Sequence, residues 1–267
     1  IAQAEDMAEQ GVKELILVAQ ETTVYGKDLY GKKSLHILLK KLCEIRGIRW
    51  IRILYCYPEE IYDELIETIR DEKKICHYLD IPIQHASDRI LKRMGRRTSK
   101  QELIDIVGKL RKEIPDIVLR TTLITGFPGE TEEDHEELKE FVDEMEFDRL
   151  GVFTYSPEEN TPAAEMADQV PEEVKEERRD ELMELQQEIS YDRGQDRIGQ
   201  ELLVMIEGKV ADESAYIGRT YGDAPKVDGY IFVQTGELLM TGDFAKVRVT
   251  GALEYDLIGV LSDEYTE

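Results

Sequence analysis

The sequence predicts an α/β protein built on parallel strands, followed by a small all-β domain. Short apolar runs alternate with helical patterns from residue 14 to about residue 156, as in a parallel sheet with helical crossovers. After Gly199 the helical patterns stop, and short β-type runs are separated by Gly and Asp turns. The 267 residues suffice for one large domain and one small domain.

The α/β region contains runs that predict strands and segments that predict helices. The expected strands are Glu14–Ala19, Trp50–Tyr55, Tyr78–Ile83, Val118–Thr125 and Leu150–Tyr155. The expected helices are Ser34–Arg46, Glu59–Asp71, Asp88–Met94, Lys100–Ile114 and Glu132–Glu144. Most of the strands are rich in Val, Ile, Leu or Tyr, as strands buried on both faces tend to be. Parallel strands with right-handed crossovers form either a barrel or a doubly wound sheet.

The first residues predict a helix that has no recognisable N-terminal start signal. Apolar residues from Ile1 to Val12 fall near helical spacing, and Gly11 is placed as a helix end. There is no initiator Met and no N-cap residue. We therefore expect the chain to be a fragment of a longer protein.

A charged helix connects the two domains. Pro171 precedes Glu172–Arg193, so we expect a first domain at residues 1–195 with a linking helix at 172–194. The small domain is then expected at residues 196–262, with strands at Glu201–Glu207, Ala215–Thr220, Gly229–Val233, Phe244–Leu253 and Asp256–Val260. Its length and rhythm are those of a small antiparallel barrel of the oligonucleotide-binding type.

The charge is strongly acidic, with 34 Lys and Arg against 58 Asp and Glu and a net charge of −24. Such a surface repels free nucleic acid and favours basic partners, although charges on solvated helix faces would give the same count. The small domain is acidic as well, with six Lys and Arg against eleven Asp and Glu from Asp196 to Ser262. The balance weighs against an RNA substrate without excluding one.

Cysteine usage and hydropathy predict a cytoplasmic protein. Cys43, Cys56 and Cys76 lie far apart, with neither a metal-binding spacing nor a disulfide pattern. No apolar run approaches the roughly 18 residues that a membrane span needs. We expect reduced thiols and no membrane association.

Polar residues follow every expected strand of the α/β region. These stretches are Gln20–Thr23, Tyr55–Pro58, Pro82–Ser87, Ile124–Thr131 and Tyr155–Asn160. In parallel α/β folds the working residues lie where strands give way to the following loops. The pattern predicts a cleft lined for a sizeable polar ligand.

Several common site motifs are missing from these strand ends. Gly126-Phe-Pro-Gly129 is followed by no Lys-Ser/Thr, and no G-x-G-x-x-G or Gly-x-Ser-x-Gly pattern occurs. The histidines, His36, His77, His85 and His135, do not pair at metal-ligand spacing. Acid–base catalysis by Glu21 and Glu130 is conceivable, as in a metal-free barrel lyase.

Arg120 stands inside the otherwise apolar strand Val118-Leu-Arg-Thr-Thr-Leu-Ile124. A guanidinium is costly there unless it is paired. Its partner is either a protein carboxylate such as Glu21 or a carboxylate or hydroxyl of a ligand.

Four segments, in order along the chain, carry a family resemblance. They are Leu17-Val-Ala-Gln-Glu-Thr-Thr-Val-Tyr-Gly-Lys-Asp-Leu-Tyr30, Asp80-Ile-Pro-Ile-Gln-His-Ala-Ser-Asp-Arg-Ile-Leu-Lys-Arg-Met-Gly-Arg96, Arg120-Thr-Thr-Leu-Ile-Thr-Gly-Phe-Pro-Gly-Glu-Thr131 and Phe153-Thr-Tyr-Ser-Pro-Glu-Glu-Asn-Thr-Pro-Ala163. The set resembles the radical S-adenosylmethionine (SAM) methylthiotransferases. The acidic β domain resembles their C-terminal TRAM domain.

The resemblance implies a partial (β/α)6 barrel that holds SAM and two 4Fe–4S clusters. Only five of the six strands are present here, so the first strand should be missing or truncated. The CxxxCxxC loop of the radical cluster should follow that strand, upstream of Ile1. We therefore expect no metal ligands in this chain, and we expect the fragment alone to be inactive.

The resemblance also implies roles for residues at the strand ends. It places Gln20, Glu21 and Thr22 at the methionine amino group of SAM, and Gln84 and Ser87 near the ribose. The resemblance also implies that Arg120 binds the methionine carboxylate or the ribose. It places Gly126, Phe127 and Tyr155 beside the adenine.

The substrate branch is indicated by Ala19-Gln-Glu-Thr-Thr-Val-Tyr-Gly-Lys-Asp-Leu-Tyr30 and Glu254-Tyr-Asp-Leu-Ile-Gly259. Both resemble the branch that methylthiolates an aspartate β-carbon on small-subunit ribosomal protein twelve, after hydrogen abstraction by a 5′-deoxyadenosyl radical. The acidic barrel mouth and TRAM domain suit this basic partner. The alternatives are a tRNA adenosine methylthiotransferase and a non-catalytic ribosome-binding module.

Overall fold

The computed structural model describes residues 1–211 and 213–266, and the side chains of this range up to residue 262. The large domain is built on a parallel sheet whose five described strands lie in chain order. These strands are β1 (Glu14–Leu17), β2 (Trp50–Ile53), β3 (Ile75–Asp80), β4 (Val118–Thr125) and β5 (Arg149–Thr154). An order without reversal is that of a barrel, whereas a doubly wound sheet reverses direction at a switch point. The predicted partial barrel is confirmed.

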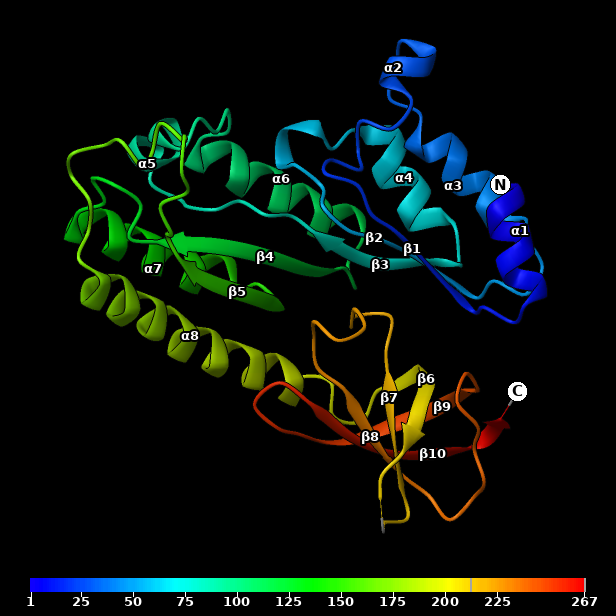
Figure 1. Ribbon diagram of the computed structural model, residues 1–267. Coiled ribbons are helices and arrows are strands. Elements are labelled where there is room, and N and C mark those ends of the chain that lie inside the picture. Colours follow the sequence, from blue (N-terminus) through cyan, green and yellow to red (C-terminus); the bar gives the residue numbers. More distant parts are fainter. Residues whose placement is uncertain (212, 267) are drawn as a thin grey trace.

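Helices lie between successive strands of this sheet, and one helix precedes β1 and one follows β5. They are α1 (Ala2–Glu9), α2 (Lys27–Tyr30), α3 (Leu35–Cys43), α4 (Asp63–Asp71), α5 (Asp88–Arg93), α6 (Lys100–Glu113), α7 (Glu132–Met145) and α8 (Glu172–Gln195), with a 3₁₀ turn, η1 (Pro58–Glu60). In Figure 1, α3, α4 and α6 lie above the strands and the C-terminal barrel lies below them. The apolar faces of these helices and the sheet form one core. Among the described residues, no helix is long and apolar enough to cross a membrane.

The predicted strand Tyr78–Ile83 lies too far toward the C-terminus, because the corresponding strand, β3, spans Ile75–Asp80. The strand begins at Ile75, because Ile75 pairs with Ile51 of β2. It ends at Asp80 rather than Ile83, since Pro82 has no N–H to donate to the ladder. The chain then rejoins the sheet through a bridge between Gln84 and Leu123.

Two helical segments differ from the prediction. The helix expected at Glu59–Asp71 is divided into η1 and α4, because Ile61 and Tyr62 have extended backbones. Both side chains pack on the core, so burial overrides local helix propensity. The short α2 was not predicted; it is bounded by Gly26 and Gly31, with φ of 85° and 71°.

The C-terminal strands close into a barrel with the order β10-β8-β7-β6-β9. Its described strands are β6 (Glu201–Lys209), β7 (Ala215–Arg219), β8 (Ile231–Gln234), β9 (Phe244–Ala252) and β10 (Leu257–Thr266). The predicted antiparallel barrel is confirmed except for the pair of β8 and β10, which is parallel. A closed ring with an odd number of strands cannot alternate throughout, so one pair must run parallel.

The two domains share an apolar cluster. Residues at the starts of β2, β3 and β4 pack against the small barrel, and Trp50 meets Phe244 edge to face with ring centroids 5.0 Å apart. The long helix α8 runs along β5 toward the small barrel (Figure 1). The barrel therefore lies against the amino ends of the parallel strands, and their carboxyl ends stay open.

Candidate functional site

Three consecutive strand ends have positive φ. Tyr55 follows β2 with φ of 58°, Gln84 follows β3 with 76°, and Gly126 follows β4 with 70°. A left-handed backbone is unusual for residues other than Gly, and it persists where surrounding contacts fix it, often at binding sites. Because the strands are parallel, these residues share the carboxyl edge of the sheet. This edge is the candidate site.

Hydrogen bonds fix the backbone after β2 residue by residue. The Tyr55 N–H donates to Asp80 Oδ2 at 3.2 Å, and the Cys56 N–H donates to the Asp80 carbonyl at 2.8 Å. The Tyr57 N–H donates to Glu21 Oε2 at 2.9 Å. The unusual Tyr55 conformation thus depends on Asp80, a functional residue that sequence reasoning missed. A carboxylate inside an apolar strand was the signal that could have found it.

The residues after β1 differ in accessibility. Thr22 is buried, and its hydroxyl donates to the Leu54 carbonyl at 2.6 Å. Glu21 accepts from the Thr23 N–H at 2.8 Å in addition to its bond from Tyr57. Gln20 is exposed and makes no side-chain hydrogen bond within the described part of the chain. Thr22 and Glu21 therefore shape the strand end, and Gln20 is available to a ligand.

Two buried side-chain oxygen atoms at this edge have no hydrogen-bond partner among the residues described. They are Oε1 of Gln84 and the hydroxyl of Tyr155. Leaving such an atom unpaired costs about 1–3 kcal/mol. The Tyr155 ring meets Phe127 at 5.2 Å between centroids and an interplanar angle of 68°. Unpaired polar atoms beside an aromatic pair suit a ligand with hydrogen-bonding groups and a flat ring.

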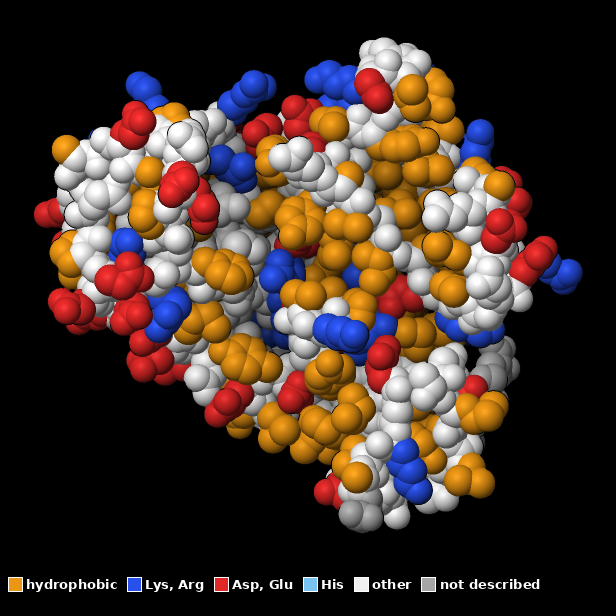
Figure 2. Space-filling view, in the orientation of Figure 1, with side chains coloured by type: hydrophobic (Ala, Val, Ile, Leu, Met, Phe, Trp, Pro, Cys, Tyr) orange, Lys and Arg blue, Asp and Glu red, His pale blue; other side chains and the backbone are white. Residues whose placement is uncertain are grey.

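Large apolar side chains are exposed at or just after the carboxyl ends of three strands of this sheet. Val18 after β1, Tyr55 after β2 and Phe153 of β5 are 61%, 48% and 59% exposed. Figure 2 shows hydrophobic and basic side chains in the hollowed middle of this face, over the parallel strands of the large domain as placed in Figure 1. Apolar side chains of this size at an open strand edge mark a binding surface.

Gly126 occupies a position that no other residue fits. Its N–H donates to Glu130 Oε2 at 2.8 Å, and a Cβ at this point would overlap the side chain of Lys175. Lys175 cannot easily move, because it is buried and its ammonium donates to the Tyr155 carbonyl at 2.9 Å. Glycine is therefore required both by φ and by space.

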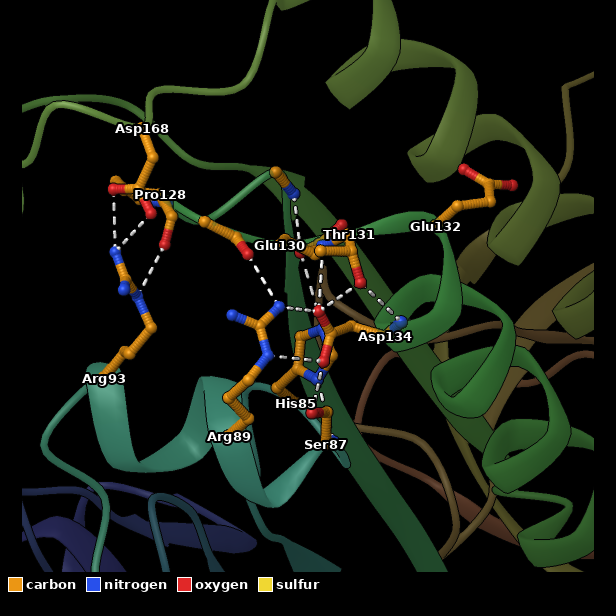
Figure 3. Close-up of polar contacts among 12 residues, drawn as sticks. His85, Ser87, Arg89, Arg93, Pro128, Glu130, Thr131, Glu132, Asp134 and Asp168 are labelled. Carbon is orange, nitrogen blue, oxygen red and sulfur yellow. Dashed lines mark hydrogen bonds and ion pairs between the residues drawn. The ribbon is translucent and has the colours of Figure 1, made fainter.

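Three arginines bind three consecutive carbonyls of the loop between β4 and α7. The pairs are Arg93 with Pro128 at 2.9 Å, Arg89 with Gly129 at 2.7 Å and Arg178 with Glu130 at 3.3 Å. Figure 3 shows Arg89 and Arg93 reaching this loop from α5, with Asp168 closing the far side of Arg93. The peptide planes of the loop are thereby fixed before any ligand arrives.

Ser87 is engaged by the first turn of α7. Its hydroxyl donates to Asp134 Oδ1 at 2.7 Å, and Arg89 pairs with the same carboxylate (Figure 3). Asp134 also accepts from the Thr131 N–H at 2.8 Å. Burial would raise the pKa of Asp134, but these bonds outweigh it and hold the pKa well below its usual range. Ser87 therefore fastens α7 at the site edge.

Glu130 is fully enclosed by donors. Oε1 accepts from Arg178 Nη1 at 2.9 Å, and Oε2 lies 3.4 Å from His85 Nε2. His85 Nδ1 accepts from the Ser87 N–H, so Nε2 carries the proton that faces Glu130. Burial alone would raise the pKa of Glu130, yet His85, the Gly126 N–H and Arg178 hold it below its usual value. Glu130 is a structural carboxylate, which gives the lyase alternative no support.

Arg120 meets protein carboxylates. Its Nη1 lies 2.7 Å from Asp80 Oδ1, and its Nε lies 3.4 Å from Asp228 Oδ1 of the small barrel. Of the two partners left open by the sequence, the protein carboxylate is present, but it is supplied by Asp80 and Asp228 rather than by Glu21.

The three cysteines are free thiols. Burial raises the pKa of Cys76 to about 12 and that of Cys56 well above its usual value. A metal ligand needs the thiolate form. Among the side chains described, those of residues 1–211 and 213–262, no group of three or more from His, Cys, Asp and Glu is arranged to hold a metal ion.

Comparison with known proteins gives family matches in both domains. Residues 1–142 match the radical SAM superfamily, and residues 198–261 match the TRAM domain. The ribosomal protein uS12 methylthiotransferase RimO of Lachnoclostridium phytofermentans is 66% identical over 259 residues, covering 97% of this chain and 59% of that protein. The protein of the same name from Clostridium botulinum (strain Langeland / NCTC 10281 / Type F) is 54% identical over 267 residues, covering 100% and 60%.

The chain thus spans about three fifths of the length of the curated relatives it matches. Among solved structures, coproporphyrinogen III oxidase (HemN) from Escherichia coli is similar with a TM-score of 0.57 at 16% identity, covering 92% of this chain and 58% of that chain. That likeness concerns the fold. Since the first family match covers more than half of the chain and agrees with its barrel-ordered parallel sheet, the chain belongs to the radical SAM superfamily.

Proposed function

We propose that this protein is a radical SAM methylthiotransferase that adds a methylthio group to the β-carbon of an aspartate on ribosomal protein uS12. The observation that carries the proposal is 66% identity, over 97% of the chain, to a protein named for this activity. The open carboxyl edge of the sheet supports it, because ligands of parallel α/β folds bind there.

SAM fits this edge by its own chemistry. It brings an amino group and ribose hydroxyls that can donate hydrogen bonds, and Gln84 Oε1 and the Tyr155 hydroxyl lack partners in the described structure. It also brings an adenine ring, which suits the pair of Phe127 and Tyr155. We propose that the amino group lies at Gln20, Glu21 and Thr22, where Gln20 has an exposed side chain and Glu21 and Thr22 hold the strand end. We propose that the ribose lies at Gln84 and Ser87, where the Ser87 hydroxyl is bonded to Asp134. The carboxylate or ribose is assigned to Arg120, and the adenine to Gly126, Phe127 and Tyr155.

The residues present do not fit an iron–sulfur cluster. Cys56 and Cys76 are buried and their thiols are held protonated, and Cys43 lies in the helix α3. A 4Fe–4S cluster held elsewhere in the full-length protein would supply the electron for the reductive cleavage of SAM. We assign both clusters of the full-length protein to cysteines outside these 267 residues.

The chain's own contribution is to hold and enclose the reactants. A radical that abstracts hydrogen from an unactivated carbon must be shielded from water and placed against one C–H bond. Val18, Tyr55 and Phe153 provide exposed apolar surface at the site edge. The loop between β4 and α7 is held in shape by hydrogen bonds from Arg89, Arg93 and Arg178, so its shape does not depend on a bound ligand.

Charge supports a basic protein partner. The chain carries 58 Asp and Glu against 34 Lys and Arg, and this net negative charge favours association with a basic ribosomal protein. We propose that the radical SAM domain spans residues 1–195, that the TRAM domain spans residues 196–262, and that the protein acts on uS12 in the cytoplasm.

The test is reconstitution of the full-length protein with iron and sulfide, followed by incubation with SAM, a reductant and uS12. We expect 5′-deoxyadenosine to form and one methylthio group to appear on a uS12 aspartate by peptide mass spectrometry. A tRNA anticodon arm is assayed in parallel. A methylthio group on a tRNA adenosine would show that the substrate is tRNA rather than uS12. Binding of uS12 without formation of 5′-deoxyadenosine would indicate a non-catalytic binding module.

A further inference from the structure

One segment of the small barrel contacts every strand of the parallel sheet that the structure describes. It comprises residues 219–230, the end of β7 and the loop to β8, and we call it the β7–β8 segment. Figure 1 shows this loop rising from the small barrel toward the sheet. Its contacts are Arg219 with Glu14 at 2.6 Å, the Tyr221 carbonyl with Arg52 at 2.6 Å, Asp228 with Tyr78 at 2.7 Å, Asp228 with Arg120 at 3.4 Å and Asp223 with Arg149 at 2.6 Å.

The charges in this contact are buried. The side chains of Asp223 and Asp228 are 3% and 2% exposed. Asp228 also accepts from the Ala224 N–H at 2.8 Å, so its carboxylate is held within the loop as well as by the sheet. Removing one partner of such a pair leaves an uncompensated buried charge, which is strongly unfavourable. The contact is therefore specific, and it is sensitive to single substitutions.

A continuous line of contacts leads from Asp228 to the candidate site. Asp228 lies 3.4 Å from Arg120 Nε, and Arg120 Nη1 lies 2.7 Å from Asp80 Oδ1. The other oxygen of Asp80 accepts from the Tyr55 N–H at 3.2 Å. Tyr55 is the residue after β2 that has φ of 58°. Arg120 and Asp80 each use one side-chain atom for the preceding contact and another for the following contact. A change at Asp228 can therefore reach Tyr55 through the side chains of Arg120 and Asp80.

We propose that Asp228 is a positioning residue of the strand-end site, acting through Arg120 and Asp80 on the backbone of Tyr55. The small barrel then helps to set the shape of the SAM site, in addition to any role in binding substrate. Arg120 is the middle of this line rather than a direct SAM ligand alone. The inference rests on the proposed function only in taking the strand ends as the SAM site.

The first test is D228N in the full-length protein, which keeps the size of the side chain and removes its charge. We expect hydrogen exchange of the backbone amides around Tyr55 to become roughly tenfold faster, and the Kd for SAM of the reconstituted protein to rise roughly three- to tenfold. The matched control is E201Q, because Glu201 forms an exposed pair with Arg248 of the small barrel and makes no contact with the sheet. We expect E201Q to change neither quantity.

A double-mutant cycle with D80N decides whether the line carries the effect. If Asp228 acts through Asp80, D80N already releases Tyr55, and adding D228N to D80N speeds exchange little further. Additive effects, or unchanged exchange around Tyr55 in a folded D228N protein, would overturn the proposal. Hydrogen exchange is measured without SAM. If the wild-type protein fails to bind SAM, the proposed function is wrong, but the exchange result still tests the link between Asp228 and Tyr55.

A second variant covers the case in which D228N fails to fold. Y78F deletes only the hydroxyl that donates to Asp228 at 2.7 Å, and it keeps the buried ring. We expect a smaller change in the same direction, roughly two- to threefold faster exchange around Tyr55. A folded Y78F protein with unchanged exchange there would contradict the proposal.

Discussion

Gly126 shows how a single residue is constrained at the strand ends. Its backbone has φ of 70°, and its missing side chain leaves room for Lys175, which in turn holds the Tyr155 carbonyl. The cost of a larger residue here therefore has two parts. One part is the left-handed backbone, and the other is the overlap with a buried neighbour.

These two parts can be separated with a matched pair of variants. Gly95 has φ of 73° and no heavy atom within 4 Å of an added Cβ, so G95A measures the backbone cost alone. We expect G126A to lower the free energy of unfolding by about 1–3 kcal/mol more than G95A, because the Lys175 side chain must shift. Urea denaturation of both variants measures the difference. Equal losses would show that Lys175 adapts without cost.

The same residues show what the sequence can predict about the site. Polar groups were expected after each strand, and they are there, because strand ends are recognisable from local pattern. The partners were not predictable: Asp80 meets Arg120 because the two residues are opposite in the register of β3 and β4. Nor did Tyr55 or Gln84 signal a positive φ, since neither residue type favours it.

At the scale of secondary structure, the N-terminus of α7 connects the site to the helical layer. Thr131 and Asp134 form a capping box, and Asp134 also binds Ser87 and Arg89. A carboxylate at a helix N-terminus is stabilised by the free N–H groups and by the helix dipole. Burial would raise the pKa of Asp134, but the hydrogen bonds from Arg89, Ser87 and Thr131 outweigh burial and hold the pKa below the ordinary value of 3.8.

The sign of this shift predicts a pH dependence. A carboxylate whose pKa is lower in the folded protein stabilises the fold above its unfolded pKa, and this stability is lost as the pH falls from about 3.8 downward. We expect D134N to lose about 2 kcal/mol at pH 7, and to lose less than the wild type between pH 5 and pH 2. Urea midpoints measured across this range test it.

The control is D143N, because Asp143 lies on the same helix and is exposed. It should follow the wild type at every pH. A D134N profile parallel to that of the wild type would show that Asp134 binds its proton equally in the folded and unfolded chains.

Elements were more predictable than contacts for a physical reason. The strands of the parallel sheet are rich in Val, Ile and Leu, as in the fully buried β2, and the long helices α6 and α7 carry capping boxes and a 3.6-residue period. The predictions were wrong where residues distant in the sequence determine the secondary structure. Ile51 extends β3 to Ile75, and core packing interrupts the expected helix at Ile61.

At the scale of the whole molecule, the two domains are coupled by apolar packing and by buried charge. Trp50, the single tryptophan of the sequence, packs on Phe244 of the small barrel. The β7–β8 segment adds ion pairs to Arg120 and Arg149, whose charges would be left buried and unpaired if the barrel unfolded alone. Domains joined in this way are expected to unfold together.

A core substitution in the small barrel tests this coupling. Val249 is buried in the barrel core and lies outside the cluster shared with the large domain, so V249A should weaken the barrel directly by about 2 kcal/mol. If the domains are coupled, Trp50 fluorescence and the far-ultraviolet circular dichroism of the helices shift together to lower urea. The matched control is V107A in α6, a core residue of the large domain that should move both signals in the same way. Two separate transitions in V249A, with the helical midpoint unchanged, would show independent domains and would remove the basis for transmission from Asp228 to Tyr55.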